Sequence, residues 1–132
     1  MSKTYSRRSS ILAGALLAAA IGLPAAVRAD ATPGQPAPAF ELSDASGKSV
    51  RLADFKGRFV VLEWTNPGCP FVVKHYGSQN MQSLQKEATA KGVVWLGISS
   101  TARDHADYLP PPALAQRYKE WGSAPSAMLM DD

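Results

Sequence analysis

Two uninterrupted apolar runs, residues 59–62 and 93–98, constrain the fold of this chain more than any other feature. Continuous apolar runs of this length are typical of strands buried on both faces, which lie centrally in α/β sheets. A helical pattern lies between the runs, and two parallel strands joined by a helix form a βαβ unit. The sequence therefore predicts an α/β sheet with residues 59–62 among its central strands and the neighbouring Trp64 in the core.

The segment between the runs begins with residues that end the first strand and start a helix. Pro67 and Gly68 end the first strand, and Pro70 directly follows Cys69. Proline is favoured at the first position of a helix because the N–H that it lacks would have no partner there. We therefore expect a helix that starts at Pro70, continues over residues 71–76 and has Cys69 as its N-cap.

A second helix is expected between Asn80, as its N-cap, and Gly92, as its C-terminal stop. Its apolar side chains recur at helical spacing, so that one face carries Met81, Leu84 and Ala88. This helix completes the connection between the two apolar strands.

Residues 30–39 are expected to form an extended linker, since three prolines and a glycine interrupt them and they show no periodicity. The predicted domain starts after this linker.

Residues 40–42 and 50–52 alternate apolar and polar side chains, and residues 43–48 between them are typical of a turn. The sequence therefore predicts an N-terminal β-hairpin.

An extended tail, a short helix and a strand are predicted after the second apolar run. Residues 110–112 are consecutive prolines and predict an extended tail, residues 113–121 predict a short helix, and residues 127–130 predict a strand. A sheet whose last strand ends so near the last residue usually needs more chain to cover its face. We therefore expect one domain over residues 40–132 that lacks its C-terminal part.

Residues 1–29 have the pattern of an export signal. A basic start that includes Arg7 and Arg8 precedes the uncharged apolar run 11–23, and small residues follow it. We expect cleavage after Ala29, with Ala31 as the alternative. The run is too short for the roughly 20 residues that a membrane-spanning helix needs, so we expect export, to a bacterial periplasm, rather than stable membrane association.

The export route stays open between the general secretory and the twin-arginine pathways, because the arginine pair is present and the usual aromatic residue after it is not. Without residues 1–29 the chain keeps ten of its fourteen basic residues against eleven acidic ones. These charges are dispersed rather than clustered, so we expect no nucleic-acid partner.

Cys69 is the one cysteine in the chain, so no internal disulfide can form. A lone cysteine is either a reactive thiol or a small buried apolar side chain. Cysteine is a nucleophile as its thiolate, and the free N–H groups and dipole of a helix N-terminus favour that anion. We expect the Cys69 sulfur to accept hydrogen bonds from the N–H groups of Phe71 and Val72, with Thr65 or Asn66 close by.

Lys74 and His75 are near Cys69 in sequence but are not expected to contact it. At 3.6 residues per turn they lie roughly 140° and 120° around the helix from Cys69. The cysteine shares its face with Val72, Val73 and Tyr76 instead. We therefore expect both basic side chains to be solvated or to serve in packing, with an indirect role at the site as the alternative.

Three stretches have a familiar pattern: P-G-Q-P-A-P-A-F-E-L-S-D-A-S-G-K-S-V-R-L-A-D-F-K-G-R-F-V-V-L at residues 33–62, C-P-F-V-V-K-H-Y at 69–76 and V-V-W-L-G-I-S at 93–99. They closely resemble the AhpC/TSA, or redoxin, family. The resemblance implies a thioredoxin-like fold in which the first apolar strand delivers a reactive cysteine to the start of the following helix. It therefore implies that Cys69 is the catalytic residue.

Several positions depart from the patterns of this family and of thioredoxins. Val72 stands where a C-x-x-C motif has its second cysteine. In the peroxiredoxin pattern P-x-x-x-T-x-x-C, the proline position is Leu62 and the threonine position is Asn66, with Thr65 one residue earlier. The family's cis-proline is expected beyond the end of this sequence, with Pro125 as the alternative. An external thiol would therefore have to complete any reaction of Cys69.

The sequence thus predicts a thiol-dependent oxidoreductase that acts on a peroxide or a disulfide, with Thr65, Asn66 and Pro70 as supporting residues. Its partners would be an external thiol reductant or a disulfide-bearing protein, and no cofactor is expected. The alternative is a non-catalytic thioredoxin-fold binding module. A metal site is not expected, because Cys69, His75, His105 and the methionines show no ligand spacing.

Overall fold

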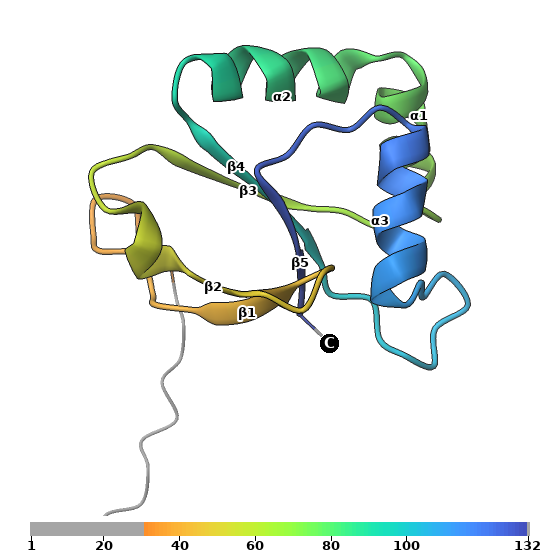
Figure 1. Cartoon of the computed structure of the whole chain (residues 1–132), viewed down its shortest axis with the longest axis horizontal. Coiled ribbons are helices and arrows are strands. Elements are labelled where there is room, and N and C mark those ends of the chain that lie inside the picture. Colours follow the sequence, from red (N-terminus) through yellow and green to blue (C-terminus); the bar gives the residue numbers. More distant parts are fainter. Residues whose placement is uncertain (1–30, 132) are drawn as a thin grey trace, which may run out of the picture. The chain divides into compact units, whose positions relative to one another are not determined.

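The computed structural model describes residues 31–131, so the predicted signal of residues 1–29 lies outside the described part. The described chain forms a mixed five-stranded sheet with the order β2-β1-β5-β4-β3 (Figure 1). The strands are β1 (Glu41–Asp44), β2 (Ser49–Arg51), β3 (Val60–Trp64), β4 (Val94–Ser99) and β5 (Ala127–Met130). The predicted strand at residues 127–130 is confirmed.

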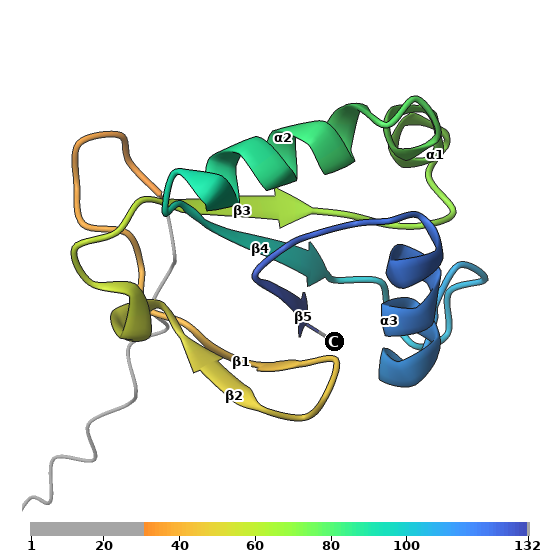
Figure 2. The same cartoon turned by 45° about the horizontal axis from the view of Figure 1, so that its top comes forward.

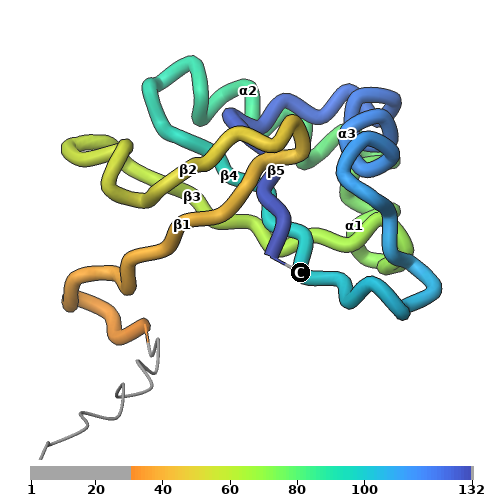
Figure 3. Tube along the Cα trace, turned by 60° about the horizontal axis from the view of Figure 1, so that its bottom comes forward, coloured from red at the N-terminus to blue at the C-terminus, as the bar shows by residue number. Residues whose placement is uncertain are grey.

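Strands β3, β4 and β5 are parallel to one another, and the hairpin β1–β2 joins them antiparallel through β1. The chain therefore contains the predicted hairpin and the predicted βαβ unit. Strand β5 runs between β1 and β4 (Figure 3). A short 3-10 helix, Leu52–Phe55, follows β2.

Three helices connect the parallel strands. Helices α1 (Pro70–Gly77) and α2 (Asn80–Ala90) lead from β3 to β4, and α3 (Pro111–Glu120) leads from β4 to β5. Figure 2 shows α1 and α2 together on one side of β3 and β4. None of the helices within residues 31–131 has the length and apolar character needed to cross a membrane.

Side chains of β5 alternate between two hydrophobic cores on opposite faces of the sheet. On the helix-covered face, Met128 and Met130 pack with buried side chains of α1 and α3: Tyr76, Leu114 and Tyr118. On the other face, Leu129 packs with Val50, Val94, Leu96 and Ile98. Helices α1 and α3 are therefore packed against the sheet whose strand ends form the site described below.

The predicted central position of residues 59–62 is wrong. Strand β3 pairs only with β4 among the described strands, and it is β4 that is buried along its whole length. On β3, Leu62 is 36% exposed and Trp64 is 62% exposed, so Trp64 is not a core residue. The reason is topological, because both crossovers place the later strand on the same side and leave β3 at the edge.

The predicted cap and inner face of α2 are also wrong. The N-cap is Gln79, in a left-handed conformation with φ 62°, and Asn80 is the first helical residue. The fully buried side chains of α2 are Gln82 and Gln85, whereas Leu84 is 45% exposed. The inner face is centred on the two glutamines because their amides hydrogen-bond to groups of α1, β3 and the segment after α3.

Helix α3 starts earlier than predicted. Pro110 is its N-cap, and Pro111 and Pro112 form its first turn rather than an extended tail. Prolines are tolerated in the first turn because the N–H groups there have no intrahelical acceptor.

Candidate active site

Cys69 is the N-cap of α1, with φ −73° and ψ 125°, and Pro70 is the first helical residue. The backbone on both sides of Cys69 is fixed. Its N–H donates to the Asn66 carbonyl at 3.0 Å, and its own carbonyl accepts the Val73 N–H at 3.0 Å, which closes the first turn of the helix. The half-buried thiol therefore has a defined position at the helix start.

One expected feature of this cap is absent. The Cys69 sulfur makes no capping hydrogen bond to the N–H groups of Phe71 or Val72. The side chain lines an open pocket instead. The thiol therefore shares the pocket with polar side chains and is not held by a capping hydrogen bond.

The pocket lies where the carboxyl ends of β3 and β4 meet, the edge at which open α/β sheets commonly bind their ligands. Its volume is about 380 Å³. The walls come from the end of β3, the first turn of α1, the end of β4 and the loop after it: Trp64, Thr65, Asn66, Cys69, Val72, Ile98, Ser100, Thr101 and His105. Hydroxyl, amide and imidazole groups thus share one space with the thiol.

Thr65 is 6% exposed and lies directly after β3. Its N–H donates to the Ile98 carbonyl at 2.9 Å, which continues the β3–β4 pairing by one residue. Its hydroxyl is hydrogen-bonded to the hydroxyl of Tyr118 on α3 at 2.5 Å. The structure therefore brings Thr65 into the Cys69 pocket. Its partner Tyr118, which sequence reasoning missed, lies in the core behind the pocket rather than in its wall.

Asn66 also lines the pocket, but both ends of its amide are occupied in the loops. The Oδ1 atom accepts the Gly68 N–H at 2.8 Å, and Nδ2 donates to the Asp107 carboxylate at 3.2 Å. Asn66 thus shapes the turn that presents Cys69 and ties this turn to the loop that follows β4.

His105 is a pocket residue that sequence reasoning considered only as a possible metal ligand. Its Nδ1 accepts the Asp107 N–H at 3.1 Å. A backbone N–H can only donate, so Nδ1 is the acceptor and the ring proton lies on Nε2. The available signal was its place shortly after the second apolar strand, whose end meets the same edge of the sheet as the end of β3.

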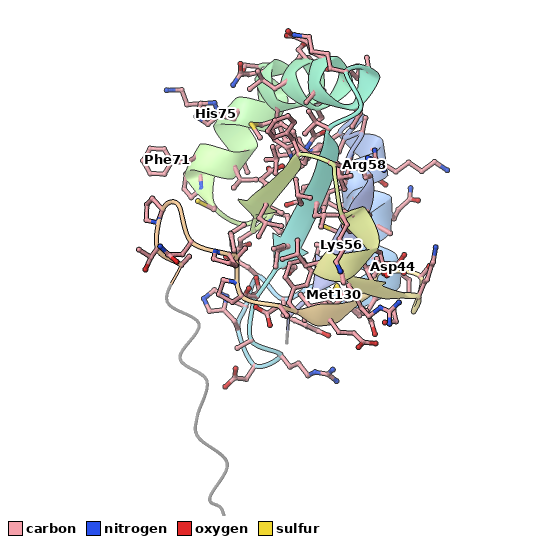
Figure 4. All side chains as sticks on the ribbon, turned by 90° about the vertical axis from the view of Figure 1, so that its left-hand side faces the viewer. Asp44, Lys56, Arg58, Phe71, His75 and Met130 are labelled. Carbon is pink, nitrogen blue, oxygen red and sulfur yellow. The ribbon has the colours of Figure 1, made fainter. Side chains whose placement is uncertain are left out.

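Lys74 and His75 are both exposed, as predicted from the helix geometry. Phe71, which is 74% exposed, and His75 project outward from α1 (Figure 4). None of the three side chains lines the pocket.

Burial dominates the electrostatics of the two core tyrosines of α1 and α3, Tyr76 and Tyr118. It raises the pKa of Tyr118 to about 12, with the neighbouring Glu63 and Cys69 charges acting in the same direction and the bond to Thr65 acting against them. Burial likewise raises the pKa of Tyr76. Both phenols therefore keep their protons throughout the neutral pH range.

Beneath the pocket, the Glu63 carboxylate joins the helices to the sheet. It accepts hydrogen bonds from the Tyr76 hydroxyl at 2.9 Å, Trp95 Nε1 at 2.7 Å and Gln85 Nε2 at 3.1 Å. Three donors from α1, β4 and α2 thus converge on one side chain of β3, two residues before Thr65.

Within residues 31–131, no three His, Cys, Asp or Glu side chains are grouped so that they could hold a metal ion. The peptide bonds of the same residues are all trans, including the bond before Pro125.

A parallel βαβ unit with a cysteine capping the helix after its first strand defines a protein of the thioredoxin-like class. Solved structures agree. An uncharacterized conserved protein of Geobacillus kaustophilus is 28% identical with a TM-score of 0.64, and the match covers 75% of this chain and 52% of that one. The thioredoxin domain of a thiol-disulfide oxidoreductase of Bacteroides vulgatus shares the fold at 23% identity with a TM-score of 0.57, covering 78% of this chain and 66% of that one.

The family model for the AhpC/TSA family matches residues 33–131, and the chain belongs to this family. An exposed lipoprotein thioredoxin of Streptococcus pneumoniae is 26% identical with a TM-score of 0.52, covering 71% of this chain and 66% of that one. A Mycobacterium tuberculosis protein named "Putative peroxiredoxin" is 50% identical over 42 residues, which are 29% of this chain and 27% of the relative. The chain thus matches little more than a quarter of the length of this curated relative.

Proposed function

We propose that this protein is an exported thiol-dependent oxidoreductase in which the Cys69 thiolate attacks a peroxide or a disulfide. The observation that carries the proposal is the place of Cys69, which caps α1 and lines an open pocket at the carboxyl edge of the parallel strands. Membership of the AhpC/TSA family supports redox chemistry at this thiol. Three neighbouring residues are proposed to support this thiol. Thr65 lines the pocket, Asn66 shapes the turn before Cys69, and Pro70 starts the helix.

With a peroxide, the Cys69 thiolate attacks the terminal peroxide oxygen and the O–O bond breaks. The sulfur is oxidised to a sulfenic acid, and the departing alkoxide or hydroxide takes up one proton to leave as an alcohol or as water. One external thiol then condenses with the sulfenic acid, which forms a mixed disulfide and releases water. A second external thiol attacks this disulfide and restores Cys69 as a thiolate.

With a disulfide, the Cys69 thiolate attacks one of its sulfur atoms and the S–S bond breaks. A mixed disulfide forms and the other sulfur leaves as a thiolate. An external thiol again completes the cycle, because the chain has no second cysteine. The pneumococcal relative, named a thioredoxin, supports the disulfide branch.

Export to the periplasm is part of the proposal. It is supported by the basic and apolar pattern of residues 1–29 and by the likeness to the pneumococcal relative, which is an exposed lipoprotein. In an oxidising compartment, the external thiol would have to come from a partner that is kept reduced.

The experiment treats the full chain separately with hydrogen peroxide plus a sulfenic-acid trap and with a small disulfide, and locates the adducts by peptide mass spectrometry. We expect a sulfenic-acid adduct or a mixed disulfide on the peptide that contains Cys69, and neither in Cys69→Ser. If the wild-type protein forms neither product, the proposal is wrong and the non-catalytic binding module is the better account.

A further inference from the structure

The hydroxyls of Tyr118 and Thr65 form a buried pair between α3 and the end of β3. Tyr118 is 3% exposed and Thr65 is 6% exposed, and their oxygen atoms are 2.5 Å apart. Thr65 lines the pocket of Cys69, whereas Tyr118 lies behind it in the helix-side core. The pair therefore connects the core to the pocket.

The direction of this hydrogen bond follows from the acidity of the two hydroxyls. A phenol, with an ordinary pKa near 10, is a far stronger acid than an alcohol and is therefore the better donor. Either hydroxyl could donate in this pair, and the acidity of the phenol favours Tyr118 as the donor and Thr65 as the acceptor. The Thr65 hydroxyl keeps its own proton, which can be donated to a different acceptor.

We propose that Tyr118 is a positioning residue that, through this bond, orients the Thr65 O–H as a donor toward the atom that becomes negative when Cys69 reacts. That atom is the departing oxygen of a peroxide or the departing sulfur of a disulfide. The proposal rests on the proposed function. It adds no proton transfer to the steps above, because the hydroxyl pair only donates hydrogen bonds and stays intact.

The surroundings of Tyr118 hold its hydroxyl in place before any substrate arrives. Its ring packs edge-on against Tyr76 of α1 and against Trp121, each at a centroid distance of 5.3 Å. Donors that are oriented in advance stabilise developing charge without a cost of reorganisation at the moment of reaction. Burial also keeps Tyr118 protonated across the neutral pH range, so that it remains a donor there.

A purely structural role, in which the bond only joins α3 to the sheet, predicts something different. Loss of such a bond would lower the stability and would change every reaction of Cys69 by a similar factor. Loss of a positioned donor slows the reactions in which charge builds up on a departing oxygen or sulfur that can accept a hydrogen bond. Alkylation by iodoacetamide releases iodide instead, and its rate falls much less.

The test uses Tyr118→Phe, Thr65→Val, their double variant, and Thr65→Ser, in the full chain. For each variant, the rate of reaction of Cys69 is measured with whichever of two probes, hydrogen peroxide or bis(2-hydroxyethyl) disulfide, reacts with the wild-type protein. The rate of alkylation by iodoacetamide is measured across pH. Tyr108→Phe is the matched control, because it removes a phenol hydroxyl outside the pocket. Unfolding by urea shows that each variant is folded under the assay conditions.

We expect Tyr118→Phe and Thr65→Val each to slow the probe reaction about tenfold, the effect of one hydrogen bond, and the double variant to lose no more than either. Iodoacetamide rates should change less than twofold, and Thr65→Ser should recover most of the rate that Thr65→Val loses. Equal losses with both reagents, additive losses, or an unchanged rate in Tyr118→Phe would overturn the proposal. If the proposed function itself is wrong, the wild-type protein will not accelerate the reaction of either probe, and this outcome differs from all of those above.

Discussion

The side-chain amide of Asn66 donates a hydrogen bond of 3.2 Å to the carboxylate of Asp107, and so joins the turn before Cys69 to the loop after β4. The same loop carries His105, whose Nδ1 accepts the Asp107 N–H. Two walls of the pocket are thereby held in one arrangement. Asp107 also lies so close to Gly68 that the turn has no room for a side chain.

This contact predicts the effect of Gly68→Ala. A Cβ atom at position 68 would lie 2.1 Å from Asp107 Cγ, so the Asp107 carboxyl group must move away from its place beside the Asn66 amide. We expect a loss of on the order of 1–3 kcal/mol in the free energy of unfolding, as for other overpacked sites. Urea unfolding measures it, and the matched background is Asp107→Ala, in which the obstructing carboxyl is gone. An equal cost of Gly68→Ala in both backgrounds would show that the contact is not the cause.

Glu63→Gln tests the polar junction beneath the pocket. The carboxylate accepts three hydrogen bonds, whereas an amide would turn an N–H₂ group toward at least one of the same donors. We expect a loss of about 1–3 kcal/mol in the free energy of unfolding, the usual cost of a buried unpaired polar group. Glu41→Gln, at an exposed carboxylate on β1, should leave the stability unchanged. A stable Glu63→Gln protein would contradict the assigned role of Glu63.

Part of this architecture follows from local sequence. Strand β5, the hairpin, Cys69 at a helix N-cap and Pro70 at the first helical position depend on neighbouring residues, and local patterns predict them. The edge position of β3 depends on which strand the second crossover adds, which no single segment encodes. The inner face of α2 carries Gln82 and Gln85 because their partners lie on other elements, so hydrophobic periodicity selected the wrong face.

The site divides in the same way. Cys69, Thr65 and Asn66 are close in sequence and could be proposed together. His105 and Tyr118 lie far along the chain. His105 reaches the pocket only because β3 and β4 end at one edge, and Tyr118 contacts the pocket residue Thr65 only because α3 packs behind it.

Alkaline pH provides a test of tyrosine burial. Burial raises the pKa of Tyr118 to about 12, whereas an unfolded tyrosine titrates near 10. Between these values the unfolded chain loses the phenol proton and the folded chain keeps it. The stability that this group contributes is therefore fully present below pH 10 and falls as the pH rises toward 12. Urea unfolding at several pH values in this window should show a smaller loss for Tyr118→Phe than for the wild-type protein; equal losses would contradict the buried phenol.

Export makes a separate prediction. Expression of the full chain in a Gram-negative bacterium, followed by fractionation and N-terminal sequencing, should give a periplasmic protein that begins at Asp30, or at Thr32 if cleavage follows Ala31. If the route is the twin-arginine pathway, replacement of Arg7 and Arg8 by lysine retains the precursor in the cytoplasm; if it is the general pathway, export persists. An uncleaved protein in the cytoplasm of wild-type cells would contradict export.

The central claim is that the fold makes Cys69 a more reactive thiol than the same cysteine outside the fold. Its most direct test is the second-order rate of Cys69 with hydrogen peroxide and with bis(2-hydroxyethyl) disulfide, compared at neutral pH between the full chain and a synthetic peptide of residues 66–72. Because the chain has one cysteine, every event is assigned to Cys69. We predict that the folded protein reacts with at least one probe about tenfold or more faster than the peptide. Equal or slower reaction with both probes would contradict the account.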